Sequence, residues 1–283
     1  MSCYQHARHA GNFADVRKHL VLWTLLDALR ENTQPFVALD LYAGVGRYDL
    51  TGEGSSATGD WQQGIGRLWE ARSEMAADPL LLGYLGAVAA KQPDPARLRY
   101  YPGSPELIRA SLRERDALIA SEPRAAARAG LRATLNRDAR CRVHSYDALT
   151  AVHALAPPPL ERGLALLDPP YESQGEYAEV ARVARILRAR WRTAIVAIWY
   201  PVVPGRPDQS LRAELTSALE VPWLVSELHI RPEAGGGRGM AGSGVLLLRP
   251  PEPLGRRLSA VLGRVHAVLD PECHGGVYGE QGP

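Results

Sequence analysis

The stretch PFVALDLYAGVGRY, residues 35–48, joins a short apolar run to a turn that contains two glycines. Such a pattern is typical of a buried strand followed by a tight turn. Glycine in the turn permits positive φ angles and lets a ligand approach the backbone closely. The spacing is AGxG instead of GxGxxG, and no Lys-Ser or Lys-Thr pair follows it. This argues against a P-loop and, less strongly, against a site for NAD.

The rest of the chain alternates strand-like and helical segments. Residues 15–32 carry apolar side chains at helical spacing, and Ser104 and Pro105 are typical first residues of a helix over 104–116. The further strand-like segments are 117–122, 140–147, 163–170, 194–201, 225–230 and 244–250. The alternation predicts an α/β fold with a mostly parallel, seven-stranded sheet covered by helices on both faces.

The last two strands are joined by RPEAGGGRGMAGS, residues 231–243, which leaves no room for a helix. We therefore expect these strands to form an antiparallel hairpin. Residues 53–98 are helical and apolar, and they lie between the first strand and the next strand-like segment. We predict one domain over residues 1–283, with 53–98 as a small inserted helical subdomain.

The composition is that of an ordinary globular protein, with 46% apolar and 23% charged residues. A net charge of +2 permits a nucleic-acid partner without demanding one. Three widely spaced cysteines (Cys3, Cys141 and Cys273) form no CxxC pattern, so we expect neither a disulfide framework nor a zinc site, and a reducing, cytoplasmic compartment. The sequence shows neither a signal peptide nor an apolar run long enough to span a membrane.

Acidic residues stand where four of the predicted strands end, and ligands bind at the carboxyl ends of strands in open α/β sheets. Asp40 precedes the glycine turn, and Asp168 follows the apolar run of the segment 163–170. Glu122 is suited to hold ribose hydroxyls, but it is equally explained as a solvated loop acid. Asp147 is placed to accept a hydrogen bond from an exocyclic amine or to cap a helix, and the two roles can coexist.

The tetrapeptide DPPY, residues 168–171, combines an acid, a rigid turn and an aromatic ring. Two prolines fix the turn, and Pro169 has no N–H, so that peptide presents only a carbonyl. Two acceptors, the Asp168 carboxylate and the Pro169 carbonyl, would then face one point beside the ring of Tyr171. A planar heterocycle with an amino group suits this arrangement, because it can donate two hydrogen bonds and stack.

LYAGVG and DPPY in this order resemble the class I S-adenosylmethionine-dependent amino-methyltransferases, whose Rossmann-like sheet also closes with an antiparallel hairpin. Those enzymes methylate an exocyclic nitrogen of adenine, cytosine or guanine, or a glutamine amide. The chain further resembles the large-subunit ribosomal RNA methyltransferase J family, whose members make N6-methyladenine in 23S rRNA. The motifs that carry this resemblance, which runs through nearly the whole chain, are YQHARHAGNFADVRKH, LDLYAGVGRYDL, RYYPGSPELI, LLDPPYE, AIWYPV and RGMAGSGV.

The resemblance implies roles for individual residues. The implied S-adenosylmethionine site comprises Lys18, His19, Tyr42, Gly44, Ser104, Glu122, Asp147, Ala148 and Asp168. Asp168 would be the catalytic acceptor, with Pro169 and Tyr171 beside it, and Tyr4 and Tyr171 would contact the target nucleotide. The chain departs from the family pattern at three points: Tyr42 replaces a frequent His, Glu122 lies in SEP instead of ELHP, and Ala148 replaces the usual Gly.

Several of these residues have simpler explanations. His6, His9 and His19 suggest a metal, but we expect none because no acidic partner lies nearby. Without the resemblance, Lys18 and His19 would be the solvated face of a helix. Residues 235–240, GGGRGM, are suited to cradle a phosphate but are equally explained as a flexible loop.

The predicted activity is methyl transfer to N6 of a specific adenine in 23S rRNA, by a monomer that acts on protein-free rRNA or an early assembly intermediate. A DNA adenine N6-methyltransferase shares DPPY, and methylation of guanine N2 in rRNA is a related alternative. A non-catalytic nucleic-acid-binding protein, such as a DNA uptake factor, is an alternative of another class. A test of S-adenosylmethionine binding distinguishes the enzymes, which need this cofactor, from the non-catalytic protein.

Overall fold

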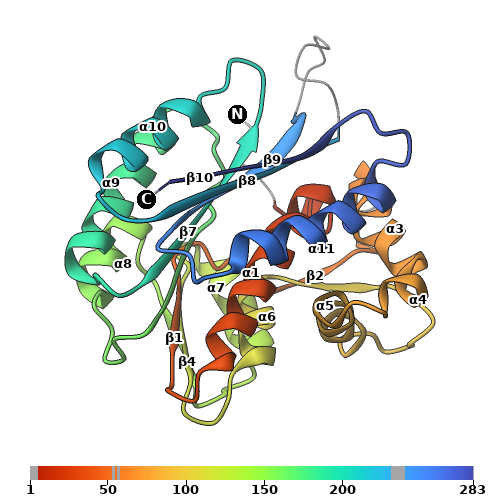
Figure 1. Ribbon diagram of the computed structural model, residues 1–283. Coiled ribbons are helices and arrows are strands. Elements are labelled where there is room, and N and C mark those ends of the chain that lie inside the picture. The colour runs from red at the N-terminus through yellow and green to blue at the C-terminus, as the bar shows by residue number, and fades with distance from the viewer. Residues whose placement is uncertain (1–5, 53–54, 56–57, 231–239, 283) are drawn as a thin grey trace.

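The computed structural model describes residues 6–52, 55, 58–230 and 240–282, and its centre is an eight-stranded sheet (Figure 1). The strand order in this sheet is β10-β8-β9-β7-β6-β1-β4-β5. In chain order the strands are β1 (Val37–Asp40), β4 (Ala117–Ser121), β5 (Cys141–His144), β6 (Gly163–Leu167), β7 (Ile195–Val202), β8 (Trp223–His229), β9 (Gly242–Leu248) and β10 (Gly276–Gly282). Two short strands, β2 (Arg47–Asp49) and β3 (Tyr100–Pro102), pair with each other outside this sheet.

Five strands, from β5 to β7, pair in parallel, and the remaining pairings are antiparallel. Strand β9 lies between β7 and β8, so β8 and β9 form the expected antiparallel hairpin. The prediction of a mostly parallel sheet closed by a hairpin is confirmed, but the sheet has one more strand than the seven expected. Residues 276–282 contain three glycines and no alternation of apolar residues, so nothing in the sequence marks β10 as a strand.

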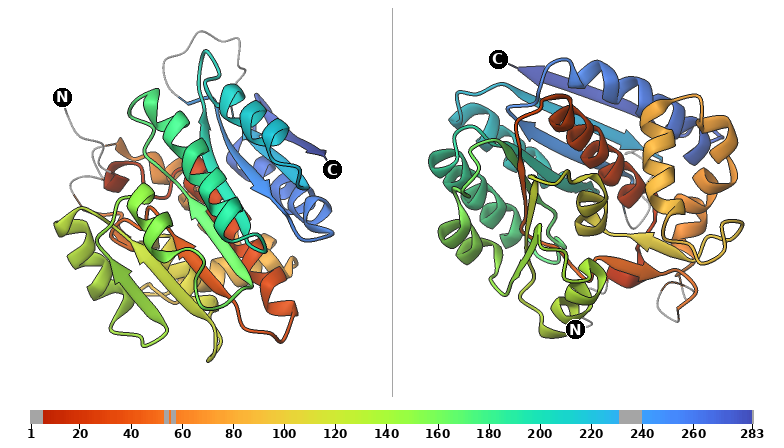
Figure 2. Two further views of the ribbon diagram at one scale, coloured as in Figure 1. Left: turned by 90° about the vertical axis from the view of Figure 1, so that its left-hand side faces the viewer. Right: turned by 90° about the horizontal axis from the view of Figure 1, so that it is seen from below.

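Helices cover both faces of the sheet, as Figure 2 shows. Along β1 and β6, successive side chains enter two different apolar cores, because strand residues alternate between faces. The core on one face includes side chains of α8 (Ala148–Leu155), α9 (Gly175–Arg190) and α10 (Asp208–Ala218). The other core includes α1 (Phe13–Glu31), α6 (Ser104–Ser111), α7 (Ala125–Leu135) and α11 (Leu254–Leu269). No helix of the described ranges is long and apolar enough to span a membrane.

The segment predicted to be an inserted helical subdomain contains short helices between β2 and β3. They are η2 (Asp60–Gln63), α3 (Ile65–Glu70), α4 (Arg72–Met75) and α5 (Pro79–Ala89), and η1 (His6–Arg8) lies near the N-terminus. Buried residues of these helices, such as Leu68 and Tyr84, belong to the same apolar core as Leu25 of α1. The insert is therefore packed onto the main domain through α1, which also carries site residues.

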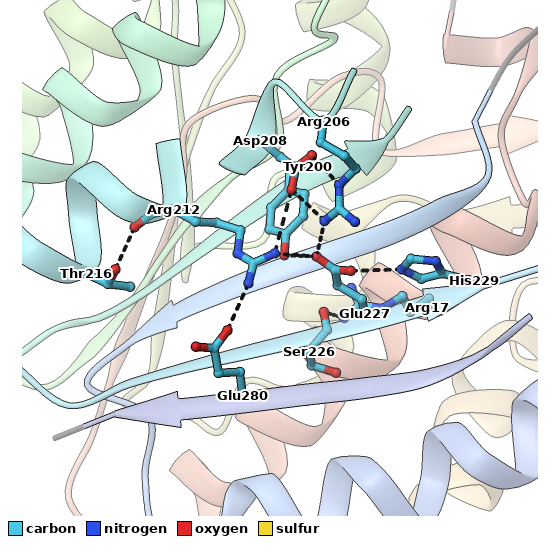
Figure 3. A network of polar contacts seen from close by, with 10 residues as sticks. All are labelled: Arg17, Tyr200, Arg206, Asp208, Arg212, Thr216, Ser226, Glu227, His229 and Glu280. Atoms are coloured by element: carbon cyan, nitrogen blue, oxygen red, sulfur yellow. Dashed lines mark hydrogen bonds and ion pairs between the residues drawn. The ribbon is translucent and has the colours of Figure 1, made fainter. Parts of the chain in front are cut away.

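A buried polar network ties the N-terminal helix α1 to the C-terminal strands (Figure 3). Arg17 is fully buried and donates to the carbonyl of Ser226 on β8. The neighbouring Glu227 carboxylate accepts hydrogen bonds, each 2.8 Å long, from Tyr200, Arg206, Arg212 and His229. Burial raises the pKa of Glu227, but the hydrogen bonds from His229 and Tyr200 and the nearby arginines outweigh burial and lower it to about 2.

Replacing Glu227 with glutamine is expected to lower the free energy of unfolding by about 2 kcal/mol at pH 7, because the half-buried guanidinium groups of Arg206 and Arg212 each lose one of their carboxylate partners. The contribution of Glu227 is complete above its ordinary pKa of 4.5 and is lost as the pH falls toward 2. The difference between variant and wild type should therefore shrink as the pH falls from about 4.5 to about 2, the range between these two pKa values. Urea unfolding at several pH values measures it, with the exposed Glu280→Gln as the control that should change little.

Candidate active site

Two cavities open at the carboxyl end of the sheet and meet at Asp168, which directly follows β6. The small cavity, about 270 Å³, extends from Asp168 toward the turn after β1. The large cavity, about 570 Å³, extends toward the insert at residues 58–63. The residues that line both cavities are His6, Lys18, Asp168 and Pro170. Groups held in the two cavities would face each other across Asp168.

The glycine turn after β1 forms one wall of the small cavity. Gly44 has a φ of +61°, which favours glycine, and its amide donates to the Glu122 carboxylate over 3.1 Å. Glu122 is buried at the end of β4 and pairs with Arg124 at 3.0 Å. Glu122 is thus a buried wall of the cavity and not a solvated loop acid.

A second wall joins the end of β1 to the start of α6. Asp40 is fully buried and accepts hydrogen bonds from the Ser104 hydroxyl (2.7 Å) and the Tyr42 amide (3.2 Å). Burial raises the pKa of Asp40 to about 6. His19 also lines this cavity, with Nδ1 2.7 Å from the Tyr101 hydroxyl. Burial lowers the pKa of His19 to about 3, so its ring is neutral at physiological pH.

Asp147 and Ala148 lie apart from this lining. Asp147 is the N-cap of α8, where its carboxylate accepts a hydrogen bond from the Thr150 amide over 2.7 Å. That hydrogen bond lowers the pKa of Asp147. The capping role is therefore observed, and contact of Asp147 or Ala148 with a cofactor stays a prediction. Tyr4 and the loop residues 235–239 lie outside the described residues.

A buried lysine joins two carboxylates where the cavities meet. Lys18 Nζ lies 2.5 Å from Asp168 Oδ2 and 2.7 Å from Asp15 Oδ1. Burial lowers the pKa of Lys18, but the two carboxylates outweigh burial and raise it above its ordinary value. Burial raises the pKa of Asp168, and the charge of Lys18 opposes that rise. The Asp168 oxygen Oδ1 has no hydrogen-bond partner among the described residues, so it is available to a ligand.

The DPPY turn places an aromatic ring at the large cavity. Tyr171 has a φ of +50°, an uncommon conformation for a residue with a side chain. Its hydroxyl donates to the Trp199 carbonyl over 2.8 Å, and its ring lies 4.4 Å from that of Tyr177 and 5.8 Å from that of Trp199. These contacts hold the tyrosine in the strained turn. Pro169, Tyr171 and Trp199 all line the large cavity, as expected for a stacking site.

The sequence did not reveal the acidic partners of two N-terminal histidines, which the fold brings near them. The expectation that His6 and His9 lack an acidic partner is wrong, because His6 lies 3.1 Å from Asp15 and His9 lies 2.8 Å from Asp60. Asp15 and Lys18 stand three residues apart on one helix, and this spacing could have predicted their ion pair. Within the described ranges, no group of three or more His, Cys, Asp or Glu side chains is placed to hold a metal ion.

Comparison with known proteins identifies the family. A family model described as "Ribosomal RNA large subunit methyltransferase D, RlmJ" matches residues 33–280. The chain belongs to the RlmJ family. It is 36% identical to the ribosomal RNA large subunit methyltransferase J of Escherichia coli K12, over 96% of this chain and 95% of that protein. It is 34% identical to the Haemophilus influenzae protein of the same name, over 97% and 96% of the two chains.

A crystal structure from Legionella pneumophila has the same fold as this RlmJ-family chain. The two superpose with a TM-score of 0.87 at 29% sequence identity, over 97% of this chain and 98% of the other. The predicted family and the Rossmann-like methyltransferase fold are thus confirmed. The comparisons assign a family of bacterial rRNA methyltransferases. The roles of single residues are proposals, for which the geometry of the two cavities is the support.

Proposed function

We propose that the small cavity binds S-adenosylmethionine and that the large cavity binds an adenosine of 23S rRNA, which is methylated on N6. The observation that carries this proposal is that the two cavities meet at Asp168. A methyl donor and a methyl acceptor must touch, and they can touch only where their sites join. The substrate class is supported by the names of the relatives, which are ribosomal RNA large subunit methyltransferases.

The residues of the small cavity fit S-adenosylmethionine. The buried Glu122 carboxylate ends β4, where an acid can accept hydrogen bonds from ribose hydroxyls. The turn at Gly44 lets a ligand approach the backbone closely. When bound, this cofactor supplies an electrophilic methyl group. Tyr42 and the neutral ring of His19 add flat surfaces to the same walls.

The large cavity supplies the acceptor side of the reaction. Asp168, Pro169 and Tyr171 line the same end of this cavity, so Asp168 Oδ1 and the Pro169 carbonyl are the candidate hydrogen-bond acceptors there. An adenine that stacks on Tyr171 would donate both N6 hydrogens to them, which favours a pyramidal nitrogen with an available lone pair. A base must leave its stack to reach such a pocket, and looped RNA lowers that cost.

As the nitrogen–carbon bond forms and the bond between the methyl carbon and the cofactor's sulfur breaks, leaving S-adenosylhomocysteine as a neutral thioether, Asp168 would accept the proton that the amine releases. Lys18 favours the ionised form of Asp168 in the resting state, because its charge opposes burial, which raises the pKa of Asp168. Since Lys18 occupies only Oδ2, Oδ1 remains available to the amine.

The test is methyl transfer from labelled S-adenosylmethionine to protein-free 23S rRNA that lacks the modification, followed by nucleoside analysis. Mature large ribosomal subunits and genomic DNA are incubated in parallel. Label in N6-methyladenosine from protein-free rRNA, with none from mature subunits, supports the proposal and an early step of ribosome assembly. Label in DNA or in another nucleoside, or no transfer despite cofactor binding, contradicts the proposed substrate.

Replacing Glu122 with alanine is expected to raise the Kd for S-adenosylmethionine by at least about tenfold, because hydrogen bonds to a charged acceptor are lost. Isothermal titration calorimetry measures this directly. The exposed Glu114→Ala, at the opposite end of β4, is the matched control and should bind as wild type does. An unchanged Kd in the Glu122 variant would show that the cofactor lies elsewhere.

A further inference from the structure

The large cavity offers more room than one nucleoside needs. It has about twice the volume of the small cavity, 570 Å³ against 270 Å³. The small cavity is proposed to take a nucleoside with an attached amino acid, which is bulkier than a nucleoside alone. A target adenosine at the DPPY end would therefore leave the other end of the large cavity, at residues 58–63, open for a second group.

The walls at this far end carry polar groups with unused hydrogen-bonding capacity. Gln63, on η2, has no hydrogen bond from its carboxamide among the described residues. Asn12 uses its Oδ1 to cap α1, accepting from the Asp15 amide, while its amino group makes no hydrogen bond in the described ranges. Carboxamides offer donors and an acceptor together, which is the pattern that matches the edge of a base.

These groups stand on a rigid support, because the insert is bound tightly to the N-terminal segment. The Ile65 amide donates to the Gly11 carbonyl over 2.8 Å, and His9 pairs with Asp60 at 2.8 Å. A Cβ atom at Gly64 would lie 2.1 Å from the Gly11 carbonyl oxygen, so the two backbones are in direct contact. The backbone that carries the exposed Gln63 side chain is thus fixed, so binding of a base there would order only the side chain itself.

We propose that the end of the large cavity formed by η2 and Asn12 binds the base of the nucleotide next to the target adenosine, and that Gln63 recognises the edge of that base. This inference rests on the proposed function. It gives the insert a role in substrate selection, since enzymes that act on an unstacked base choose their sequence context through contacts to flanking nucleotides.

The test uses 23S rRNA transcripts in which each nucleotide beside the mapped N6-methyladenosine is replaced in turn by the other three. The wild-type enzyme should prefer one neighbour by about tenfold in kcat/KM, the discrimination expected of a two-point contact to a base edge. Gln63→Ala should reduce this preference to less than about threefold. Gln62→Ala is the matched control, because Gln62 is the same residue type on the same helix but does not line the cavity.

Gln63→Glu keeps the acceptor and removes the donor, so it should shift the preference toward a neighbour that presents an amino group at that edge. A preference that persists unchanged in Gln63→Ala, or a wild-type enzyme indifferent to both neighbours, would overturn the inference and leave the proposed function standing. A preference lost equally in Gln62→Ala would also overturn it. If the unaltered transcript gains no N6-methyladenosine at all, the proposed function fails first, and the two failures are thereby distinguished.

Discussion

The Asp168→Ala variant is expected to transfer methyl groups to 23S rRNA at least about a thousandfold more slowly than wild type, because it loses both a positioning acceptor and the proton acceptor. Its Kd for S-adenosylmethionine should change little, since the Glu122 and Gly44 walls are untouched. The fold should persist because Lys18 keeps its second carboxylate, Asp15, at 2.7 Å. Single-turnover methyl transfer and calorimetry on the same preparation measure the two quantities.

Asp168→Asn distinguishes positioning from proton transfer. The amide keeps the size of the side chain and one acceptor oxygen, but it cannot take up a proton at neutral pH. If proton acceptance is essential, this variant should be nearly as slow as Asp168→Ala. Near-normal turnover by either variant would contradict the mechanism, whatever the affinity for the cofactor.

Local patterns were sufficient to predict the parallel sheet and its hairpin. Apolar runs that end at Asp40 and Asp168 marked buried strands, and those strands form the centre of the sheet. The eighth strand was missed because β10 has a largely exposed, glycine-rich sequence whose pairing depends on the edge of β8. Its register is set by a partner strand far earlier in the chain, as Gln281 lies opposite Leu224.

Reasoning from the residues alone predicted site residues only at strand ends, whereas the family resemblance supplied Lys18, His19, Tyr42 and Ser104, which also line the small cavity. Glu122 and Asp168 followed from their positions at strand ends and line the cavities. Asp147 also follows a strand, but its observed contact is the N-cap of α8. An acid after a strand suits both a ligand contact and a helix cap, so the sequence could not separate the two roles. The pairings of Asp15 with His6 and of Asp60 with His9 depend on how the N-terminal segment folds against α1 and the insert, which spacing alone does not show.

Replacing Lys18 with methionine is expected to slow methyl transfer about a hundredfold at pH 7, with partial recovery as the pH rises. Methionine has a similar length but removes the charge that opposes the burial-induced rise in the pKa of Asp168. The pKa of Asp168 should therefore rise further, so a larger fraction of the carboxyl is protonated at pH 7 and cannot accept the amine proton. The acid limb of the pH–rate profile should move to higher pH.

The same variant should change how stability depends on pH. A carboxyl whose pKa is raised by folding binds more protons in the folded than in the unfolded state, so it stabilises the protein at low pH and loses that effect as the pH rises. Asp168 belongs to this class, because burial raises its pKa and the lysine no longer opposes that rise, whereas Asp15 keeps the charge and hydrogen bond of His6, which lower its pKa. The Lys18→Met protein should thus lose stability relative to wild type between pH 5 and pH 8, roughly the range in which such buried carboxyls titrate.

Thermal unfolding at the two pH values measures this difference, and Lys18→Arg is the control that keeps the charge. The arginine variant should retain the wild-type dependence of stability on pH even if its bulk lowers activity. If Lys18→Met instead showed the wild-type pH–rate profile with a uniformly lower rate, Lys18 would act only through packing. An unshifted profile would then mean that the ionisation of Asp168 does not depend on the 2.5 Å contact with Lys18.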